Sequence, residues 1–271
     1  MSVPQLKRCE ATESSRCEVL GGVRTSSPRW ARLPHSSSPQ SIARVNNPSW
    51  PNAGSPILID RLTYDKVPYW ALPDLLGLFM SKLGRSPAGA NKRNFYLPLT
   101  AVYEMWCKKL IGEGVTPYVF QCTWNEEGDF FLGASRGAYS RHSERPWLAV
   151  VDRARFGVIK SEPLTLAGWS LARSPCMEWR KKKDGTPFGR CAETYPFCKL
   201  LKTCGKGQAE KVYGLALSRP YLSSPHYDDR LSGPIWARLW KPCLNCKELI
   251  RIHGGKYENF LVATGSAGAP P

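Results

Sequence analysis

The chain has 271 residues, of which 42% are hydrophobic, and a mean hydropathy of −0.35, values typical of a globular protein rather than a disordered one. Its net charge of +16 favours a polyanionic partner such as RNA or DNA. No apolar run approaches the ~18 residues of a membrane-spanning helix, and the first residues hold no apolar core of a secretory signal. We therefore expect an intracellular protein of the cytoplasm or nucleus, with no signal peptide and no membrane partner.

Residues 1–56 have the composition of a disordered basic tail. The stretch 21–56 holds eight Ser and six Pro, and no Asp or Glu occurs between Glu18 and Asp60. Without periodic apolar residues such a segment cannot bury enough surface to offset the entropy of ordering it. We expect order to begin near residue 57.

Apolar spacing and turn residues divide the middle of the chain into helices and hairpins. Residues 57–95 are predicted to form an N-terminal helical extension, with a helix from about 75 to 83 that Gly84 ends. The further expected elements are a helix over 99–110, a hairpin of 118–124 and 129–133, and a second hairpin of 147–151 and 156–159.

The C-terminal third alternates helix, strand, helix and strand. A helix is expected to begin between Cys191 and Thr194, because Pro196 is tolerated only within the first turn. The pattern then predicts a strand at 211–219, a long functional loop at 220–241, a helix from Pro242-Cys243 to Ile250 and a last strand at 257–264.

Three of the ten cysteines stand where these two helices begin. Cys243 and Cys246, at i and i+3, share one face of a helix start, and Cys191 opens the other helix. Three thiolates converging on one point suit Zn²⁺ with a fourth position open to water, whose pKa the metal lowers towards ~7. Glu193, two residues after the first cysteine, would exchange a proton with that water without binding the metal.

The motifs Cys191-Ala192-Glu193 and Pro242-Cys243-Leu244-Asn245-Cys246 resemble the signature of the zinc-dependent cytidine deaminase-like superfamily. By this resemblance Cys191, Cys243 and Cys246 are zinc ligands and Glu193 is the proton shuttle of a hydrolytic deamination. The fold implied is α/β, a three-layer α-β-α deaminase-like sheet in residues 96–271 with its motif core at 189–264. Only 25 residues follow Cys246, so the sheet is expected to be short at its C-terminal end.

The substrate implied by the resemblance is a nucleobase, with cytosine favoured over adenine. Single-stranded RNA or DNA is the preferred form, because the basic run Arg180-Lys181-Lys182-Lys183 precedes the motif and aromatic residues follow it. We expect substrate contacts from Trp240, Ala192, Pro242 and Arg190, the last also offsetting the negative charge of three thiolates. The pattern also resembles deaminating toxins and effectors.

The same residues are also compatible with other functions. A free nucleoside or nucleotide deaminase would need no nucleic acid, and a catalytically inactive zinc protein that binds nucleic acid would keep the metal for stability alone. A structural zinc module would fill the fourth position with Cys198, Cys204 or His226. A redox Cys-x-x-Cys is a more distant alternative.

Overall fold

The computed structural model describes residues 58–111, 116–136, 146–180, 185–205, 207–218 and 238–261, all within one compact unit. The strands are β1 (Leu58–Tyr64), β2 (Val67–Ala71), β3 (Val119–Asn125), β4 (Phe130–Ala134), β5 (Val212–Ser218) and β6 (Leu239–Trp240). The helices are α1 (Leu72–Ser81), α2 (Leu97–Ile111), α3 (Pro146–Ile159), α4 (Glu162–Leu166), α5 (Pro175–Arg180), α6 (Thr194–Pro196) and α8 (Leu244–Ile252). Helical turns of other types cover Lys92–Tyr96, Phe197–Leu201, Ala209–Lys211 and Tyr257–Phe260.

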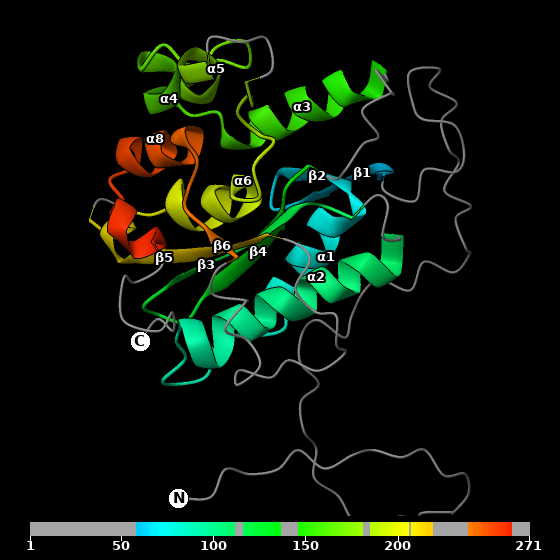
Figure 1. Ribbon diagram of the computed structural model, residues 1–271, viewed down its shortest axis with the longest axis vertical. Helices are drawn as coiled ribbons and strands as arrows, with labels where there is room; N and C mark the ends of the chain where they lie inside the picture. Colours follow the sequence, from blue (N-terminus) through cyan, green and yellow to red (C-terminus); the bar gives the residue numbers. More distant parts are fainter. Residues whose placement is uncertain are drawn as a thin grey trace, which may run out of the picture. The chain divides into compact units, whose positions relative to one another are not determined.

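A four-stranded antiparallel sheet in the order β4-β3-β5-β6 forms the centre, and β1 and β2 pair as a separate hairpin (Figure 1). Successive side chains of a strand point to opposite faces, so each strand serves two cores. In β4, Phe131 belongs to the core on the side of α6 and α8, while Phe130 and Leu132 belong to the core on the side of α2. The described chain is therefore a mixed α/β fold with helices on both faces of its main sheet.

Helix α1 lies along β4, at one edge of the sheet. The Leu132 N–H donates to Ser81 Oγ at 2.9 Å, so a side chain of α1 takes the place of a neighbouring strand. A Cβ on Gly77 would lie 2.6 Å from the Leu132 carbonyl oxygen, so only glycine allows this close approach. At the other edge β6 has two residues and is followed closely by Pro242.

Most elements expected from the sequence are confirmed. The helices predicted at 75–83, 99–110 and from Pro242-Cys243 to Ile250 correspond to α1, α2 and α8, the 118–133 hairpin to β3 and β4, and the strand at 211–219 to β5. The helix expected to begin between Cys191 and Thr194 is α6 with the turn after it. Of the loop expected at 220–241, residues 220–237 lie outside the described part, as do residues 1–57, which contain the predicted tail.

Three expectations differ from the structure. The second hairpin, predicted from strands at 147–151 and 156–159, is the helix α3. Val151, Asp152, Arg155, Val158 and Ile159 are buried at helical spacing, and the two charged residues lie in the segment between the predicted strands. The strand predicted at 257–264 is a helical turn as far as residue 260, and 262–264 lie outside the described part.

The third correction concerns residues 57–95, which are not helical throughout. Their described residues contain the β1–β2 hairpin before α1 and belong to the same compact unit as the other described residues. The Tyr195 hydroxyl donates to the Pro68 carbonyl at 2.9 Å, which ties this hairpin to α6. Tyr69 and Tyr195 also stack, with ring centroids 4.7 Å apart.

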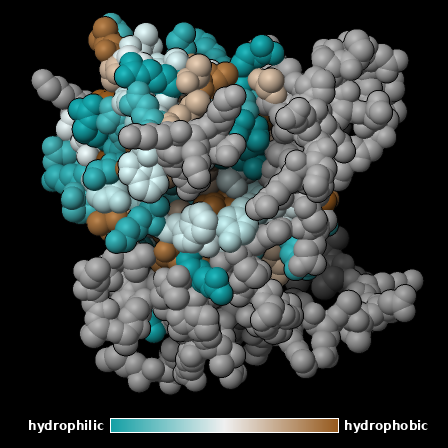
Figure 2. Space-filling model, turned by 45° about the horizontal axis from the view of Figure 1, so that its top comes forward, coloured by the Kyte–Doolittle hydropathy of each residue, from teal (hydrophilic) through white to brown (hydrophobic). Residues whose placement is uncertain are grey.

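Among the described residues, none of the helices combines the length and the apolar character required to cross a membrane. Hydrophilic side chains cover much of the described surface in Figure 2, and the hydrophobic ones are scattered between them.

Candidate metal centre

The three cysteines of the two motifs come together at the start of α8. Cys243 is the N-cap residue of this helix and Cys246 lies in its first turn, so both sulfur atoms point towards the helix N-terminus. Cys191 lies in the turn that leads into α6. The positive end of the α8 dipole favours thiolates at this position.

The distances between the sulfur atoms suit a shared metal ion. Cys191 Sγ lies 3.4 Å from Cys243 Sγ, and Cys243 Sγ lies 3.5 Å from Cys246 Sγ, with all three within 4.8 Å of one another. A tetrahedral ion with bonds of about 2.3 Å places sulfur atoms about 3.8 Å apart. The separations are too long for a disulfide, whose bond is about 2.05 Å. The group could therefore hold a metal ion.

The thiols of this cluster differ in how readily they lose a proton. Hydrogen bonds with Cys243, and then with Cys246, lower the pKa of the Cys191 thiol to about 6. Burial, followed by the hydrogen bond with Cys191, raises the pKa of Cys246 well above its usual range. Cys191 therefore becomes a thiolate, the form that binds metals, more readily than Cys246.

Glu193 lies beside the three sulfurs but outside the group that could hold the ion. It is the N-cap residue of α6 and is 6% exposed. Burial raises the pKa of its carboxyl group, while a hydrogen bond with Cys246 works in the opposite direction. A buried carboxyl next to a metal site, but not part of it, can exchange protons with a group bound there.

Arg155 of α3 holds the turn that carries Cys191. Its guanidinium donates to the carbonyl oxygens of Gly189 at 2.5 Å and Cys191 at 3.0 Å, and it pairs with Asp74 at 2.5 Å. It also donates to the Ala134 carbonyl at 2.8 Å. The side chains of Arg155 and Asp74 are 2% and 1% exposed. One buried cation thus joins α1, β4, α3 and the cysteine turn.

A second charged group of α3 fixes the same turn from outside. Asp152 accepts from Arg190 Nε at 3.0 Å and Nη2 at 2.6 Å, and it also pairs with Arg136. Arg190 was expected to contact substrate and to offset the charge of the thiolates. The structure shows its guanidinium bound to Asp152, with its side chain 37% exposed.

Gly133 in β4 allows the start of α6 to lie directly on the sheet. A Cβ at this position would be 2.4 Å from the Ala192 carbonyl oxygen and 2.5 Å from Pro196 Cδ. The side chain of Ala192 is 1% exposed and packs in the interior; a contact of this residue with substrate stays a prediction. The distance of the Cys191 turn from the sheet therefore depends on residue 133 being a glycine, which has no side chain.

Cys176 in α5 is a fourth cysteine near the cluster, and sequence reasoning missed it. A hydrogen bond with Cys243 is the main cause that raises the pKa of Cys176. Its backbone N–H donates to Asn245 Oδ1 at 2.9 Å, and Asn245 Nδ2 donates to the Thr186 carbonyl at 2.7 Å. Asn245 stands between the two cysteines of its motif, so it fixes α5 against the start of α8. The only sequence signal was the spare cysteine itself.

Of the fourth-ligand candidates considered from the sequence, Cys198 and Cys204 do not join the cluster. Cys198 is 6% exposed and packs in the core, and the Cys204 thiol donates to the Leu200 carbonyl at 2.5 Å. His226 lies outside the described residues. The three-sulfur group of the described part contains none of them.

Trp240 and Pro242 lie between the sheet edge and the cluster. Trp240 is 47% exposed and its ring centroid is 5.4 Å from that of Tyr118, so it is not a core residue. Pro242 is half-buried directly before Cys243. Both precede Cys243 by at most three residues in the sequence, and a contact of either with substrate stays a prediction.

A cavity of about 450 Å³ runs along α8 from the residue that follows Cys243. Aromatic and basic side chains line it: Lys247 Nζ lies 4.9 Å from the centre of the Tyr257 ring, and Trp169 Nε1 donates to Glu248 at 2.9 Å. Arg251, which also lines it, pairs with the same glutamate at 2.7 Å. Such a surface offers ring faces and cations side by side.

No protein-family model, no curated protein and no solved structure matches the chain. Conclusions about its function therefore depend on the residues and geometry of the chain itself.

Proposed function

We propose that the protein is a zinc-dependent hydrolytic deaminase that acts on a nucleobase, with cytosine favoured over adenine. The observation that carries this proposal is the convergence of Cys191, Cys243 and Cys246 beside a buried Glu193 that is not one of the ligands. A structural site does not need such a carboxyl group, whereas a hydrolytic site does. The helices on both faces of the antiparallel sheet are compatible with the cytidine deaminase-like fold that the motifs resemble.

The three sulfurs would hold the metal, since zinc favours thiolate ligands and the measured separations fit tetrahedral coordination. Bound zinc supplies Lewis-acid activation of water. The chain supplies the proton path: the Glu193 carboxylate accepts a proton from water and returns it to the departing amine, which leaves as ammonia. The reaction consumes one water and converts the C–NH₂ group of the base into a carbonyl.

Single-stranded nucleic acid is the substrate form that the surface beside α8 supports best. Lys247 and Arg251 stand next to Tyr257 and Trp169 along the cavity that begins next to Cys243. Cations that follow a backbone and rings that stack on bases are the common means of holding single strands. A free nucleoside would use the rings but gain little from the cations, so its binding would respond little to salt.

A closed structural site is the second candidate, because the Cys176 thiol interacts with Cys243. A small movement of α5 would bring a fourth sulfur to the metal and displace water. X-ray absorption of the zinc-loaded protein counts the bound sulfur atoms. Three sulfurs with one lighter ligand support the deaminase, and four sulfurs that fall to three in Cys176→Ser support the structural site.

The decisive experiment compares wild type with Glu193→Gln for zinc content and for ammonia release from cytidine, adenosine and single-stranded oligonucleotides. We expect about one zinc per chain in both proteins and a loss of about 10²–10⁴-fold in rate for the variant. Glu162→Gln, an exposed glutamate of α4, is the matched control and should keep the wild-type rate. Zinc-loaded wild type that releases no ammonia from any of these substrates would refute the proposal.

A further inference from the structure

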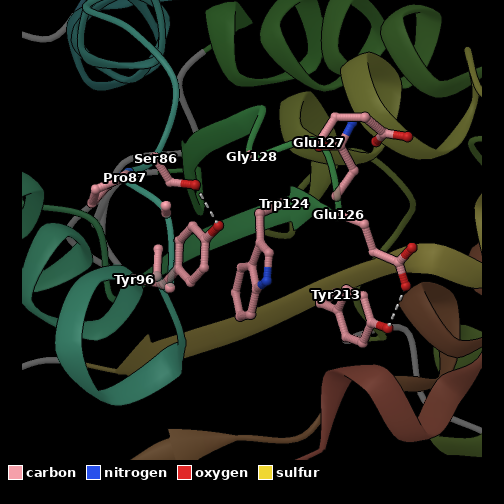
Figure 3. Close-up of a pocket in the computed structure, with 12 residues that line it drawn as sticks. Ser86, Pro87, Tyr96, Trp124, Glu126, Glu127, Gly128 and Tyr213 are labelled. Carbon is pink, nitrogen blue, oxygen red and sulfur yellow. Dashed lines mark hydrogen bonds between the residues drawn. The ribbon is translucent and has the colours of Figure 1, made fainter.

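A cavity of about 350 Å³ lies at the turn between β3 and β4 (Figure 3). It shares no lining residue with the cysteine cluster. Its aromatic wall belongs to the core on the α2 side of the sheet, whereas Cys246 belongs to the core on the opposite side. Cavities of this volume are of the size that holds small ligands.

The indole N–H of Trp124 is an unsatisfied donor at this cavity. Trp124 is 7% exposed, and among the described residues nothing accepts a hydrogen bond from its nitrogen. The nitrogen is not fully buried, and Trp124 is one of the residues that line the cavity. Figure 3 shows it on the side of the ring that faces Tyr213. An accessible donor at a cavity wall that no described protein group engages is free to bond a ligand that brings an acceptor.

Three aromatic rings form the wall as a ladder. Tyr96 and Trp124 stack with centroids 3.9 Å apart and planes 10° apart, and Trp124 and Tyr213 lie 6.3 Å apart at 18°. A cage for an organic cation turns ring faces towards one centre from several directions. Nearly parallel rings instead extend a stack, which suits a flat aromatic ligand.

The charged groups that line the cavity are the carboxylates of Glu126 and Glu127, and Ser86 and Asn125 add neutral polar groups. Glu126 Oε2 pairs with Lys211 at 2.8 Å, while its Oε1 has one long contact of 3.4 Å, from the Tyr213 hydroxyl. The hydrogen bond from Lys211 lowers the pKa of Glu126, so this carboxylate can only accept. Glu127, which is exposed, forms no ion pair among the described residues. The site therefore disfavours phosphate and favours a ligand with an amine donor.

We infer that this cavity binds a flat heteroaromatic base that carries an exocyclic amine, as free base or nucleoside without phosphate. The amine would donate to Glu126, and a ring nitrogen or carbonyl would accept from the Trp124 indole N–H. Adenine and cytosine carry both kinds of group on one planar ring. This inference does not depend on the proposed function, because it uses no residue of the cysteine cluster.

The test follows the Trp124 indole resonance by two-dimensional NMR of ¹⁵N-labelled protein. The chain has ten tryptophans, and Trp124→Phe removes and so assigns one indole signal while keeping an aromatic ring. The Glu193→Gln chain is used throughout, so that no probe is consumed. Adenosine and cytidine are the probes, with AMP and CMP to test phosphate, uridine to test the amine, and choline to test a simple cation.

We expect adenosine or cytidine to shift the Trp124 signal saturably, with AMP and CMP at least several-fold weaker. Trp124→Phe, measured by calorimetry, and Glu126→Gln should each weaken binding by about two- to tenfold, the range for one hydrogen bond. Glu258→Gln, an exposed glutamate near the C-terminus of the described chain, is the control and should bind as before.

The inference is overturned if neither nucleoside shifts the signal, if choline shifts it equally well, or if uridine binds as tightly as cytidine. Ammonia release plays no part in these readouts. Failure of the proposed deaminase activity therefore leaves this result intact, and the reverse also holds.

Discussion

Arg155→Lys tests whether the cysteine turn owes its geometry to the buried guanidinium. Lysine keeps the positive charge for Asp74, but a single ammonium group cannot also reach the carbonyl oxygens of Gly189 and Cys191. These bonds are 2.5 and 3.0 Å long in the structure and come from a charged donor. Such hydrogen bonds contribute about 1.5–3 kcal/mol each, so we expect a loss of about 3–6 kcal/mol in the free energy of unfolding.

The same change should weaken metal binding, because the Cys191 carbonyl and sulfur belong to one residue. Loss of a group that orients a ligand typically lowers metal affinity by about 10–100-fold. Competition with a chromophoric chelator measures the zinc affinity, and denaturant unfolding measures the stability. Arg153→Lys, an exposed arginine on the same helix, should leave both quantities unchanged.

A control for general destabilisation separates the two effects. Leu217→Ala removes a fully buried side chain from the core on the opposite face of the sheet and should cost about 2–5 kcal/mol. It does not touch the cysteine turn, so zinc affinity of the folded protein should stay within about twofold of wild type. If Arg155→Lys also keeps wild-type zinc affinity while unfolding more easily, Arg155 is a packing residue only and the reasoning is refuted.

Two further predictions use other positions. Gly133→Ala should lower zinc affinity and destabilise the fold by about 1–3 kcal/mol, because its Cβ would lie 2.4 Å from the Ala192 carbonyl oxygen. Gly157→Ala is the control: its Cβ would meet nothing within 4 Å, so the change should be neutral or stabilising. Equal zinc affinity in the two variants would contradict this account. Burial, and then the charge of Lys202, lower the pKa of His253 below its usual 6.5, so the folded state binds fewer protons than the unfolded state and stability should fall as pH drops below about 6.5. His253→Gln should lose less stability than wild type between pH 7.5 and 5.5 in urea unfolding, and an identical loss would show that His253 does not titrate in this way.

The parts of the site that lie close together in sequence were predictable. Cys243 and Cys246 are three residues apart at a helix start, and Glu193 follows Cys191 by two, so local geometry sufficed to place them in pairs. The positioning groups were not predictable in this way. Asp74 and Arg155 are 81 residues apart in the sequence, and both are buried. A charged residue is predicted to lie at the surface unless its buried partner is known.

The errors in the fold have a similar origin. The apolar segments 147–151 and 156–159 suggested two strands, but α3 buries Asp152 and Arg155 between them because charged partners from other elements neutralise both side chains. In place of the last predicted strand, a helical turn is held against β5 by Phe260. This side chain is 3% exposed and packs in the space that Gly214 leaves. Contacts with distant parts of the chain determine the secondary structure of both segments, and the sequence pattern of one segment gives no information about such contacts.

The two edges of the main sheet limit how copies of this chain can associate. The β4 edge is occupied by Ser81 of α1, and the β6 edge offers two residues before Pro242, which has no N–H to donate. Among the described residues, a second molecule that approached either edge would find few free backbone groups to continue the ladder. Strand addition, the route by which exposed edges lead to fibres, is therefore disfavoured at both ends of this sheet.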